Sequence, residues 1–273
     1  MVQAAGVVLA GGRSSRMGVA KAGLEWHGST LLRRVVGLLS RGVDGPVVVV
    51  RAPGQSLPAL PPGVDVLDDP AEGGGPLQGL AVGLAAVAGR ADVAFVGSTD
   101  LPFLHPLFVR RVTEAVDAGH DIALPHVGGF RQPLAAAYAT ALAGLAAELV
   151  AEGHAAPRPL LERARTLVLD ETALAGLDLR SVENLNTAAQ YATARAEPAP
   201  EVVVQRYGVL ASAGQSGSRA VRAATVGAAA EAVGLVLDRH VLAAVNGDQT
   251  SRDPQTPLLA GDVVALLSAD AGG

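Results

Sequence analysis

The only lysine of the chain, Lys21, closes a glycine-rich loop that follows an apolar run, and every other basic residue is an arginine. Gly11 and Gly12 allow a sharp turn that exposes successive backbone N–H groups. Arg13, Arg16 and Lys21 add positive charge to the same concavity. A turn that needs only glycine would explain the two glycines but not the three cations. The loop therefore predicts a phosphate-binding site.

The spacing of this loop excludes a dinucleotide fingerprint, which needs G-x-G-x-x-G, and a Walker A loop, which needs Gly-Lys followed by Ser or Thr. It resembles the loop of the molybdenum cofactor guanylyltransferases and their cytidylyltransferase relatives, L-A-G-G-x-S-x-R-M-G-x-D-K. The matching residues are Leu9, Ala10, Gly11, Gly12, Ser14, Arg16, Met17, Gly18 and Lys21. Ala20 stands where many members have aspartate. The resemblance implies that residues 9–14 bind the nucleotide and that Arg16 and Lys21 hold its triphosphate.

Asp100 is the second candidate for chemistry, because it follows an apolar run that predicts a buried strand over 92–97. A carboxylate at the end of such a strand is suited to bind Mg²⁺, which bridges triphosphate oxygens. Asp100 could instead cap the turn before Pro102. The segment resembles the family's C-D-x-P-[FY], whose aspartate is a metal ligand, with Thr99 in the cysteine position.

A third segment begins at Asp69 and ends in Gly75-Pro76-Leu77-Gln78-Gly79. It resembles the family's base-recognition segment G-P-L-x-G. The resemblance implies that Asp69 accepts from N1 and N2 of guanine while backbone groups at the helix start contact the base edge. Without the resemblance, these glycines and the proline predict only a flexible loop before a helix.

Asn184 and Asn186 precede Thr187, which is a plausible helix cap. The guanylyltransferases carry N-x-N-T here, near the pterin acceptor, whereas the cytidylyltransferases more often show D-x-D-T, so the resemblance favours guanosine. Residues 131–134, Arg-Gln-Pro-Leu, resemble another acceptor-side segment. Either asparagine could instead bond its own backbone in a turn.

The first 196 residues alternate between strand and helix patterns, which predicts a doubly wound, mostly parallel α/β sheet of Rossmann-like type. Strands are expected at 2–9, 47–50, 64–67, 92–97, 121–124 and 132–138, and helices at 30–41, 76–88, 106–118 and 139–152. Ser29 or Thr30 is expected to cap the first of these helices. Ligands of such sheets lie beyond the carboxyl ends of the strands. The glycine loop and Asp100 both fall at that edge.

Composition restricts the class of protein. The 273 residues are 49% hydrophobic and 3% aromatic, and they carry a net charge of −5 with no cysteine. Disulfides and thiolate chemistry are thereby excluded, and the acidic balance argues against nucleic acid as a partner. Every apolar run is interrupted before membrane-spanning length, and the six histidines lack zinc-ligand spacing. We expect a cytoplasmic enzyme without membrane or nucleic-acid partners.

The pattern changes after residue 196. Residues 197–200, Glu-Pro-Ala-Pro, predict a short stiff linker, and residues 201–273 predict the order ββαββ of a small β-grasp domain. Its helix is expected at 228–237, and Asn246-Gly247 is expected to form a turn after the strand at 241–245. The domain ends in Gly272-Gly273 and resembles the small sulfur-carrier subunit of molybdopterin synthase. The resemblance implies that an E1-like enzyme adenylates the Gly273 carboxylate and that the synthase large subunit is a partner. The sulfur carrier of the thiamine pathway is closely similar, and a frayed tail is the other interpretation.

Together, the resemblances imply transfer of GMP from Mg-GTP to molybdopterin, plus sulfur carriage by the C-terminal domain. Three alternatives remain. The first is a cytidylyltransferase that uses CTP, and the second is a sugar-phosphate nucleotidyltransferase. The third is a sulfur-carrier or docking protein whose first domain is degenerate.

Overall fold

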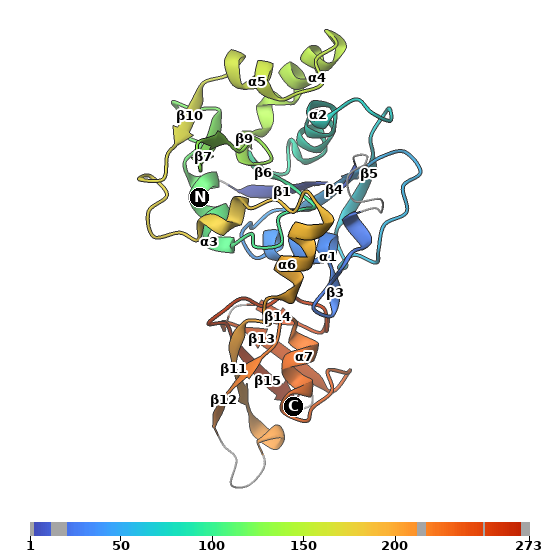
Figure 1. The fold of residues 1–273 in the computed structure, drawn as a ribbon, viewed down its shortest axis with the longest axis vertical. Helices are drawn as coiled ribbons and strands as arrows, with labels where there is room; N and C mark the ends of the chain where they lie inside the picture. Colours follow the sequence, from blue (N-terminus) through green and yellow to red (C-terminus); the bar gives the residue numbers. More distant parts are fainter. Residues whose placement is uncertain (1–2, 12–20, 212–216, 248, 269–273) are drawn as a thin grey trace. The chain divides into compact units, whose positions relative to one another are not determined.

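A computed structural model describes residues 3–11, 21–211, 217–247 and 249–268 (Figure 1). By its contacts the chain divides into two compact units, the first made of residues 1–24 and 31–188 and the second of residues 25–30 and 189–273. Helix α6 (Ala188–Ala196) falls in the second unit except for its first residue, whereas the sequence analysis assigned it to the first domain. Within the described part of the chain, no helix is long and apolar enough to cross a membrane.

The described residues of the first unit build an eight-stranded sheet in the order β10-β7-β9-β6-β1-β4-β5, with β8 paired to β7. Its strands are β1 (Ala4–Leu9), β4 (Val47–Arg51), β5 (Asp65–Asp68), β6 (Val93–Ser98), β7 (Ile122–Val127), β8 (Phe130–Arg131), β9 (Ala135–Ala139) and β10 (Thr166–Leu169). The strands β6, β1, β4 and β5 run parallel, and β9 runs antiparallel to both β6 and β7. The mostly parallel sheet that the sequence predicts is present.

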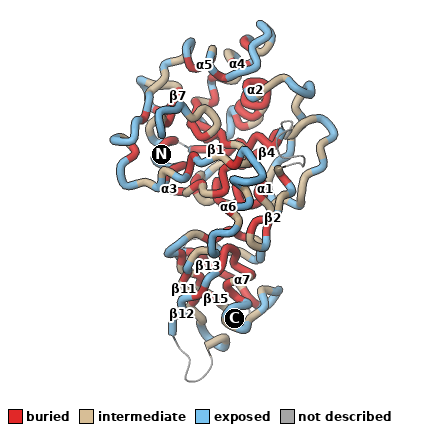
Figure 2. Tube along the Cα trace, in the orientation of Figure 1, coloured by how far each residue is buried: buried red, intermediate tan, exposed pale blue. Residues whose placement is uncertain are grey.

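Helices cover both faces of this sheet (Figure 1). On one face lie α2 (Pro76–Val87), α4 (Ala143–Ala151) and α5 (Arg158–Arg163), and on the other lie α1 (Leu31–Ser40) and α3 (Pro106–Glu114). Successive side chains of β1 point to opposite faces of the sheet, so this strand contacts a helix on each face. A Cβ at Gly83 of α2 would meet Val7, and a Cβ at Gly6 would meet Leu39 of α1, so both helices approach the strand closely. Buried residues accordingly fill the centre of the unit (Figure 2).

Two helices of the first unit differ from the predicted ranges. The helix expected at 106–118 ends at Glu114, because the carboxylate of Asp117 accepts from the N–H groups of Gly119 and His120 and forms a turn. The helix expected at 139–152 begins as a 3₁₀ turn, η2 (Thr140–Leu142). The strand expected at 132–138 begins only at Ala135, and residues 132–134 lie outside it.

The second unit contains a five-stranded sheet in the order β12-β11-β15-β13-β14. Its strands are β11 (Glu201–Arg206), β12 (Ser218–Arg222), β13 (Val241–Val245), β14 (Gln249–Ser251) and β15 (Val263–Ser268), with helix α7 (Val226–Glu231) between β12 and β13. The first and last strands, β11 and β15, pair in parallel, and the other described pairs are antiparallel. A hydrophobic cluster that includes Val204, Val226 and Leu266 lies between α7 and the sheet.

Two details of this sheet differ from the expectation. The helix predicted to reach residue 237 ends at Glu231, because Gly234 adopts a φ of 76° in the turn that follows. The predicted Asn246-Gly247 turn is present, with φ of 57° and 83°, and it leads into β14, a strand that the sequence analysis did not include.

A small hairpin, β2 (Glu25–Trp26) and β3 (Ser29–Thr30), belongs to the second unit although it follows the glycine loop in sequence. Ser29 and Thr30, of which the sequence predicts one as a helix cap, form β3, and Thr30 directly precedes the first residue of α1. The turn residues His27 and Gly28 have φ of 45° and 89°, which is the conformation of a tight two-residue hairpin turn.

Candidate active site

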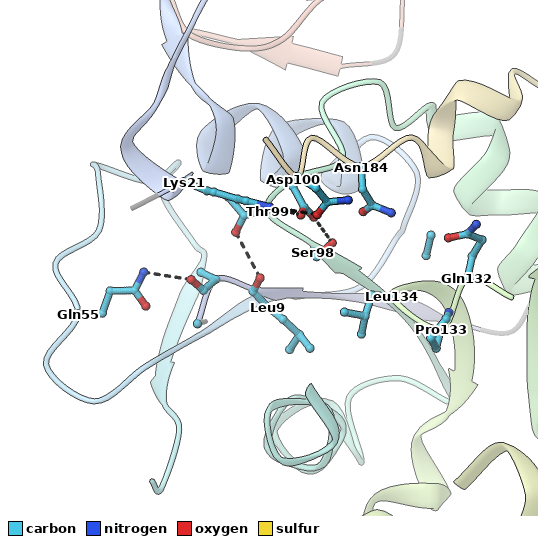
Figure 3. A pocket seen from close by; sticks show the side chains of 14 residues that line it. Leu9, Lys21, Gln55, Ser98, Thr99, Asp100, Gln132, Pro133, Leu134 and Asn184 are labelled. Atoms are coloured by element: carbon cyan, nitrogen blue, oxygen red, sulfur yellow. Dashed lines mark hydrogen bonds and ion pairs between the residues drawn. The ribbon is translucent and has the colours of Figure 1, made fainter. Parts of the chain in front are cut away.

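A pocket of about 400 Å³ lies in the first unit at the carboxyl ends of β1 and β6 (Figure 3). Strand ends, two loops and the segment before α6 supply its walls. The lining residues are Leu9, Ala10, Gly11, Lys21, Gln55, Ser98, Thr99, Asp100, Gln132, Pro133, Leu134, Ala135, Asn184 and Asn186. This is the edge at which the parallel topology predicts a ligand site.

Parallel pairing brings the first two sequence motifs together. Leu9 of β1 is in register with Ser98 of β6, and the backbone N–H of Thr99 donates to the carbonyl of Leu9 at 3.3 Å. The buried Thr99 hydroxyl donates to the same carbonyl at 3.2 Å. Thr99, which stands in the family's cysteine position, therefore links the strand that leads into the glycine loop to the segment that carries Asp100.

Lys21 and Asp100 form the charged centre of the pocket (Figure 3). The Lys21 Nζ lies 2.7 Å from the Asp100 Oδ2, and the two side chains are 18% and 15% exposed. The Ser98 hydroxyl donates to the other oxygen, Oδ1, at 2.5 Å. The same Nζ also lies 3.5 Å from the Asn186 Oδ1. A cation and a carboxylate are thus held side by side with limited access to water, where charge interactions are stronger than in bulk solvent.

Gln55, which the sequence analysis did not select, fixes the glycine loop from the opposite wall. Its Nε2 donates to the carbonyl of Ala10 at 3.0 Å, while its Oε1 accepts from the N–H of Ala52 at 3.0 Å. A Cβ at Gly11 would lie 3.1 Å from the Ala52 nitrogen, so the loop backbone passes close to the end of β4. The signal available in the sequence was only that Gln55 follows a strand that ends at the same sheet edge.

The acceptor-side segments predicted from the sequence also reach the pocket, except for Arg131, which is not in its lining. The buried hydroxyl of Tyr138 donates to the carbonyl of Pro133 at 2.7 Å and so fixes residues 132–134. The N–H of Leu185 donates to the backbone carbonyl of Asp100 at 3.1 Å, which holds Asn184 and Asn186 beside the charged pair.

The segment expected to recognise the base does not line this pocket, but it contacts residues that do. A Cβ at Gly79 would lie 3.2 Å from the Leu9 side chain and 3.7 Å from the Asp69 Oδ2. The amide of Gln78 donates both to the Asp69 Oδ1 and to the carbonyl of Ala71. Partial burial raises the pKa of Asp69, and the hydrogen bond from Gln78 partly offsets that shift.

Gly75 and Leu77 are held by the loop between α4 and α5. Gly75 has a φ of 82°, and a Cβ there would lie 2.5 Å from the carbonyl oxygen of Ala155. The same oxygen accepts from the N–H of Leu77 at 3.0 Å. Pro76 lacks an N–H and the Leu77 N–H is bonded to Ala155, so neither of these two positions donates to a base edge in this structure. Recognition of the base by the start of α2 stays a prediction.

Several predicted residues lie outside the described part of the chain. These are Gly12, Arg13, Ser14 and Arg16 of the glycine loop and Gly272 and Gly273 of the tail.

A mostly parallel sheet with the Lys21–Asp100 pair at its carboxyl edge, beside the glycine loop, is the arrangement of a nucleotidyltransferase. The chain belongs to the family described as MobA-like NTP transferase domain, whose model matches residues 6–168. A probable molybdenum cofactor guanylyltransferase of Mycobacterium tuberculosis H37Rv is 38% identical over 192 residues, which cover 69% of this chain and 91% of the relative. The chain is therefore an enzyme of the nucleotidyltransferase class.

Solved structures share the fold of the first unit. Molybdopterin-guanine dinucleotide biosynthesis protein A from Archaeoglobus fulgidus superposes with a TM-score of 0.58 at 23% identity, over 70% of this chain and 96% of that one. A Mycobacterium tuberculosis H37Rv protein solved in complex with manganese gives a TM-score of 0.51 at 21% identity, over 70% of this chain and 97% of that one. The predicted α/β nucleotidyltransferase fold is thus confirmed for this part of the chain.

The donor set of the pocket fits a magnesium ion held jointly with a substrate. No three His, Cys, Asp or Glu side chains of the described residues gather at one point, so these residues offer no complete metal cage. Mg²⁺ is commonly held by one or two carboxylates, with phosphates and water as its other ligands. Asp100 supplies one such carboxylate, and each of its oxygens keeps a lone pair beyond those used by Lys21 and Ser98.

Proposed function

We propose that the first unit transfers GMP from GTP to the terminal phosphate of molybdopterin and releases pyrophosphate. The observation that carries this proposal is the Lys21–Asp100 pair at the junction of β1 and β6. The guanylyltransferase names of relatives at 38% identity support the choice of reaction. The manganese complex of a structural neighbour is consistent with use of a divalent ion.

In this proposal Lys21 turns from Asp100 to the triphosphate when the nucleotide binds. Lys21 is a compact cation with three donors, and it can follow the charge that develops on the leaving pyrophosphate. Asp100 would hold Mg²⁺, which neutralises phosphate charge and orients the triphosphate. Ser98 keeps the Asp100 carboxylate in place through its 2.5 Å hydrogen bond. The Lys21–Asp100 contact therefore keeps both groups in the pocket before substrate arrives.

Asp69 would bind N1 and N2 of guanine, while Asn184, Asn186 and Gln132 would contact the pterin acceptor. Cytosine lacks the paired donors that a carboxylate accepts from guanine, so Asp69 favours GTP over CTP. The position of Asn186 beside Lys21 supports placing the acceptor next to the reacting phosphate. Arg13 and Arg16 remain proposed phosphate ligands on sequence grounds.

Titration of GTP and CTP with Mg²⁺, followed by a transfer assay on molybdopterin, tests this function. We expect GTP to bind and GMP to be transferred.

Lys21→Ala and Asp100→Ala should each reduce kcat/KM by the equivalent of about 2–4 kcal/mol, the range for losing a preorganised charge contact. Arg165→Ala is the matched control, because its ion pair with Asp121 at 2.6 Å lies at the start of β7, away from the strand ends that form the pocket. Transfer at the wild-type rate by both pocket variants would reject the assignment, and preferred binding of CTP would favour the cytidylyltransferase alternative.

We further propose that residues 201–273 form a β-grasp sulfur carrier, with residues 197–200 as the linker and residues 1–196 as the transferase domain. The strand order β12-β11-β15-β13-β14, with the first and last strands paired in parallel around one helix, supports this fold. β15 ends at Ser268 and leads directly into the Gly272-Gly273 tail. An E1-like enzyme would adenylate the Gly273 carboxylate with ATP and release pyrophosphate. Sulfur from a donor would then displace AMP, which leaves with one carboxylate oxygen, and the resulting thiocarboxylate would serve the synthase large subunit.

Intact-mass measurement tests the sulfur-carrier proposal independently of nucleotide transfer. After incubation with an E1-like activating enzyme, ATP and a sulfur donor, the mass should rise by the difference between sulfur and oxygen. Deletion of Gly272 and Gly273 should abolish this change and leave GMP transfer intact. A wild-type chain that never acquires sulfur with an activating enzyme of either the molybdopterin or the thiamine pathway would reject the proposal and leave this domain as a docking module.

A further inference from the structure

Within the second unit, the β2–β3 hairpin is bonded to helix α6. Arg195 donates from Nε to the Glu25 Oε2 at 2.5 Å, and its Nη1 lies 3.1 Å from the His27 Nδ1. The Tyr191 hydroxyl donates to the backbone carbonyl of Glu25 at 2.5 Å. Two helix residues one turn apart therefore hold the first strand of the hairpin.

Aromatic side chains also pack between the β2–β3 hairpin and helix α6. Trp26 is 3% exposed and meets the Tyr191 ring at a centroid distance of 6.4 Å and the His27 ring, edge-on, at 5.6 Å. The N–H of Gly28 donates to the Glu25 Oε1 at 2.8 Å, so both carboxylate oxygens of Glu25 are bonded. We call Glu25, Trp26, Tyr191 and Arg195 the hairpin–helix clamp.

The two segments that the clamp joins both lead to the pocket of the first unit. Lys21 lies four residues before Glu25, and the intervening turn is closed by the bond from the Leu24 N–H to the Lys21 carbonyl at 3.1 Å. Asn186 lies five residues before Tyr191. The Lys21 Nζ and the Asn186 Oδ1 lie 3.5 Å apart. The segment from Lys21 to Glu25 therefore contacts the segment from Asn186 to Arg195 at two places. One contact is between Lys21 and Asn186 in the pocket, and the other is the clamp.

We propose that Glu25 and Arg195 are positioning residues for nucleotidyl transfer, which set Lys21 and Asn186 relative to each other by closing the hairpin on α6. This inference rests on the proposed function of the same pocket. It assigns to the second unit a role in the reaction of the first, separate from sulfur carriage.

The expected effect of the clamp is on geometry more than on stability. The Arg195 and Glu25 side chains are 35% and 53% exposed, and ion pairs at such exposed positions contribute little to stability. Partial burial of Glu25 opposes its ionisation, yet its bonds to Arg195 and Gly28 hold the pKa below the usual 4.5, so the pair is charged at neutral pH. A displacement of about 1 Å at a catalytic group, in contrast, can reduce a rate about a hundredfold.

The test uses the full-length chain and its single tryptophan, Trp26, as a reporter of clamp opening. Glu25→Arg places two guanidinium groups together and should shift Trp26 emission to the red. The reversed pair, Glu25→Arg with Arg195→Glu, should restore the emission. Arg165→Ala is the matched control, since its ion pair with Asp121 also joins distant segments of the chain.

Transfer kinetics with Mg-GTP then decide the inference. We expect Glu25→Arg to reduce kcat by about ten- to a hundredfold with a smaller change in KM for GTP, and the reversed pair to recover most of the loss. The control should keep wild-type emission and kinetics. If emission shifts while kcat stays at the wild-type value, or if emission recovers in the reversed pair but kcat does not, the clamp does not position the site. A wild-type chain that transfers no GMP would instead overturn the proposed function, and this inference with it.

Discussion

At the scale of single residues, the pocket depends on groups that are far apart in sequence and adjacent at one sheet edge. Lys21 and Asp100 could be brought together from the sequence, because the glycine loop and Asp100 follow parallel strands whose carboxyl ends lie side by side. Asn186 could be placed in the site only through the family resemblance. Gln55 could not be found in this way, since its role depends on a loop path that carries no residue pattern. The hydrogen bond from the Leu77 N–H to the Ala155 carbonyl could not be predicted either, because it depends on the position of a loop that is distant in sequence.

Gln78 is predicted to control how GTP binding depends on pH. If guanine donates to the ionised form of Asp69, as the proposed function requires, GTP affinity should fall as pH drops through the pKa of Asp69, which burial raises above 3.8. Gln78 donates to the charged form and limits this shift. Gln78→Met should therefore move the loss of GTP affinity to higher pH, as measured by titration calorimetry across the acid range.

The control for this prediction is binding of inorganic triphosphate, which does not contact the base site and should respond equally in both proteins. Asp69→Asn should remove the acid-side dependence with or without Gln78. An identical pH profile for wild type and Gln78→Met would contradict the proposed role of Asp69 in reading guanine.

At the scale of elements, long apolar strands and helices could be predicted, while short and polar elements could not. β1 and α2 match their predicted ranges closely, because a buried strand and a helix with Pro76 in its first turn carry strong local signals. The hairpin β2–β3 was missed, since its turn uses His27 at positive φ, a conformation that is rare outside glycine. β10 and β14 are three or four residues long and gain their pairing from neighbouring strands.

Asp262 is predicted to stabilise the junction between the β13–β14 turn and β15. Its side chain is buried and accepts from the Asn246 Nδ2 and the Leu259 N–H, both at 2.8 Å. Asp262→Ala would remove both hydrogen bonds, and each such bond contributes about 0.5–1.5 kcal/mol to stability. Hydrogen exchange of β13 and β15 amides should accelerate accordingly. Asp238→Ala, an exposed aspartate of the same unit that accepts from the His240 N–H, should change stability by at most about 0.5 kcal/mol.

At the scale of the whole molecule, two domains were predicted on one chain from a change in sequence pattern near residue 197, and their functions were predicted from family resemblances. The alternation of strands and helices before that point, and its loss after it, distinguish the two sheets. The contacts of α6 and the hairpin did not follow from the pattern, because residues 25–30 and 189–196 are remote in sequence. Only a structure could assign both to the second unit.

Cleavage of the folded chain between Glu197 and Pro198 should separate the two proposed activities. Both residues are exposed and lie after α6 and before β11, so a protease site inserted there should be cut without disturbing either element. The hairpin–helix clamp remains on the N-terminal fragment, because α6 ends at Ala196. We therefore expect that fragment to retain GMP transfer and the Trp26 emission of the intact chain, while only the C-terminal fragment gains sulfur. The uncut chain with the same insertion is the control. If cleavage abolishes transfer, the strands after residue 200 support the pocket directly, and the boundary proposed at 197–200 is wrong.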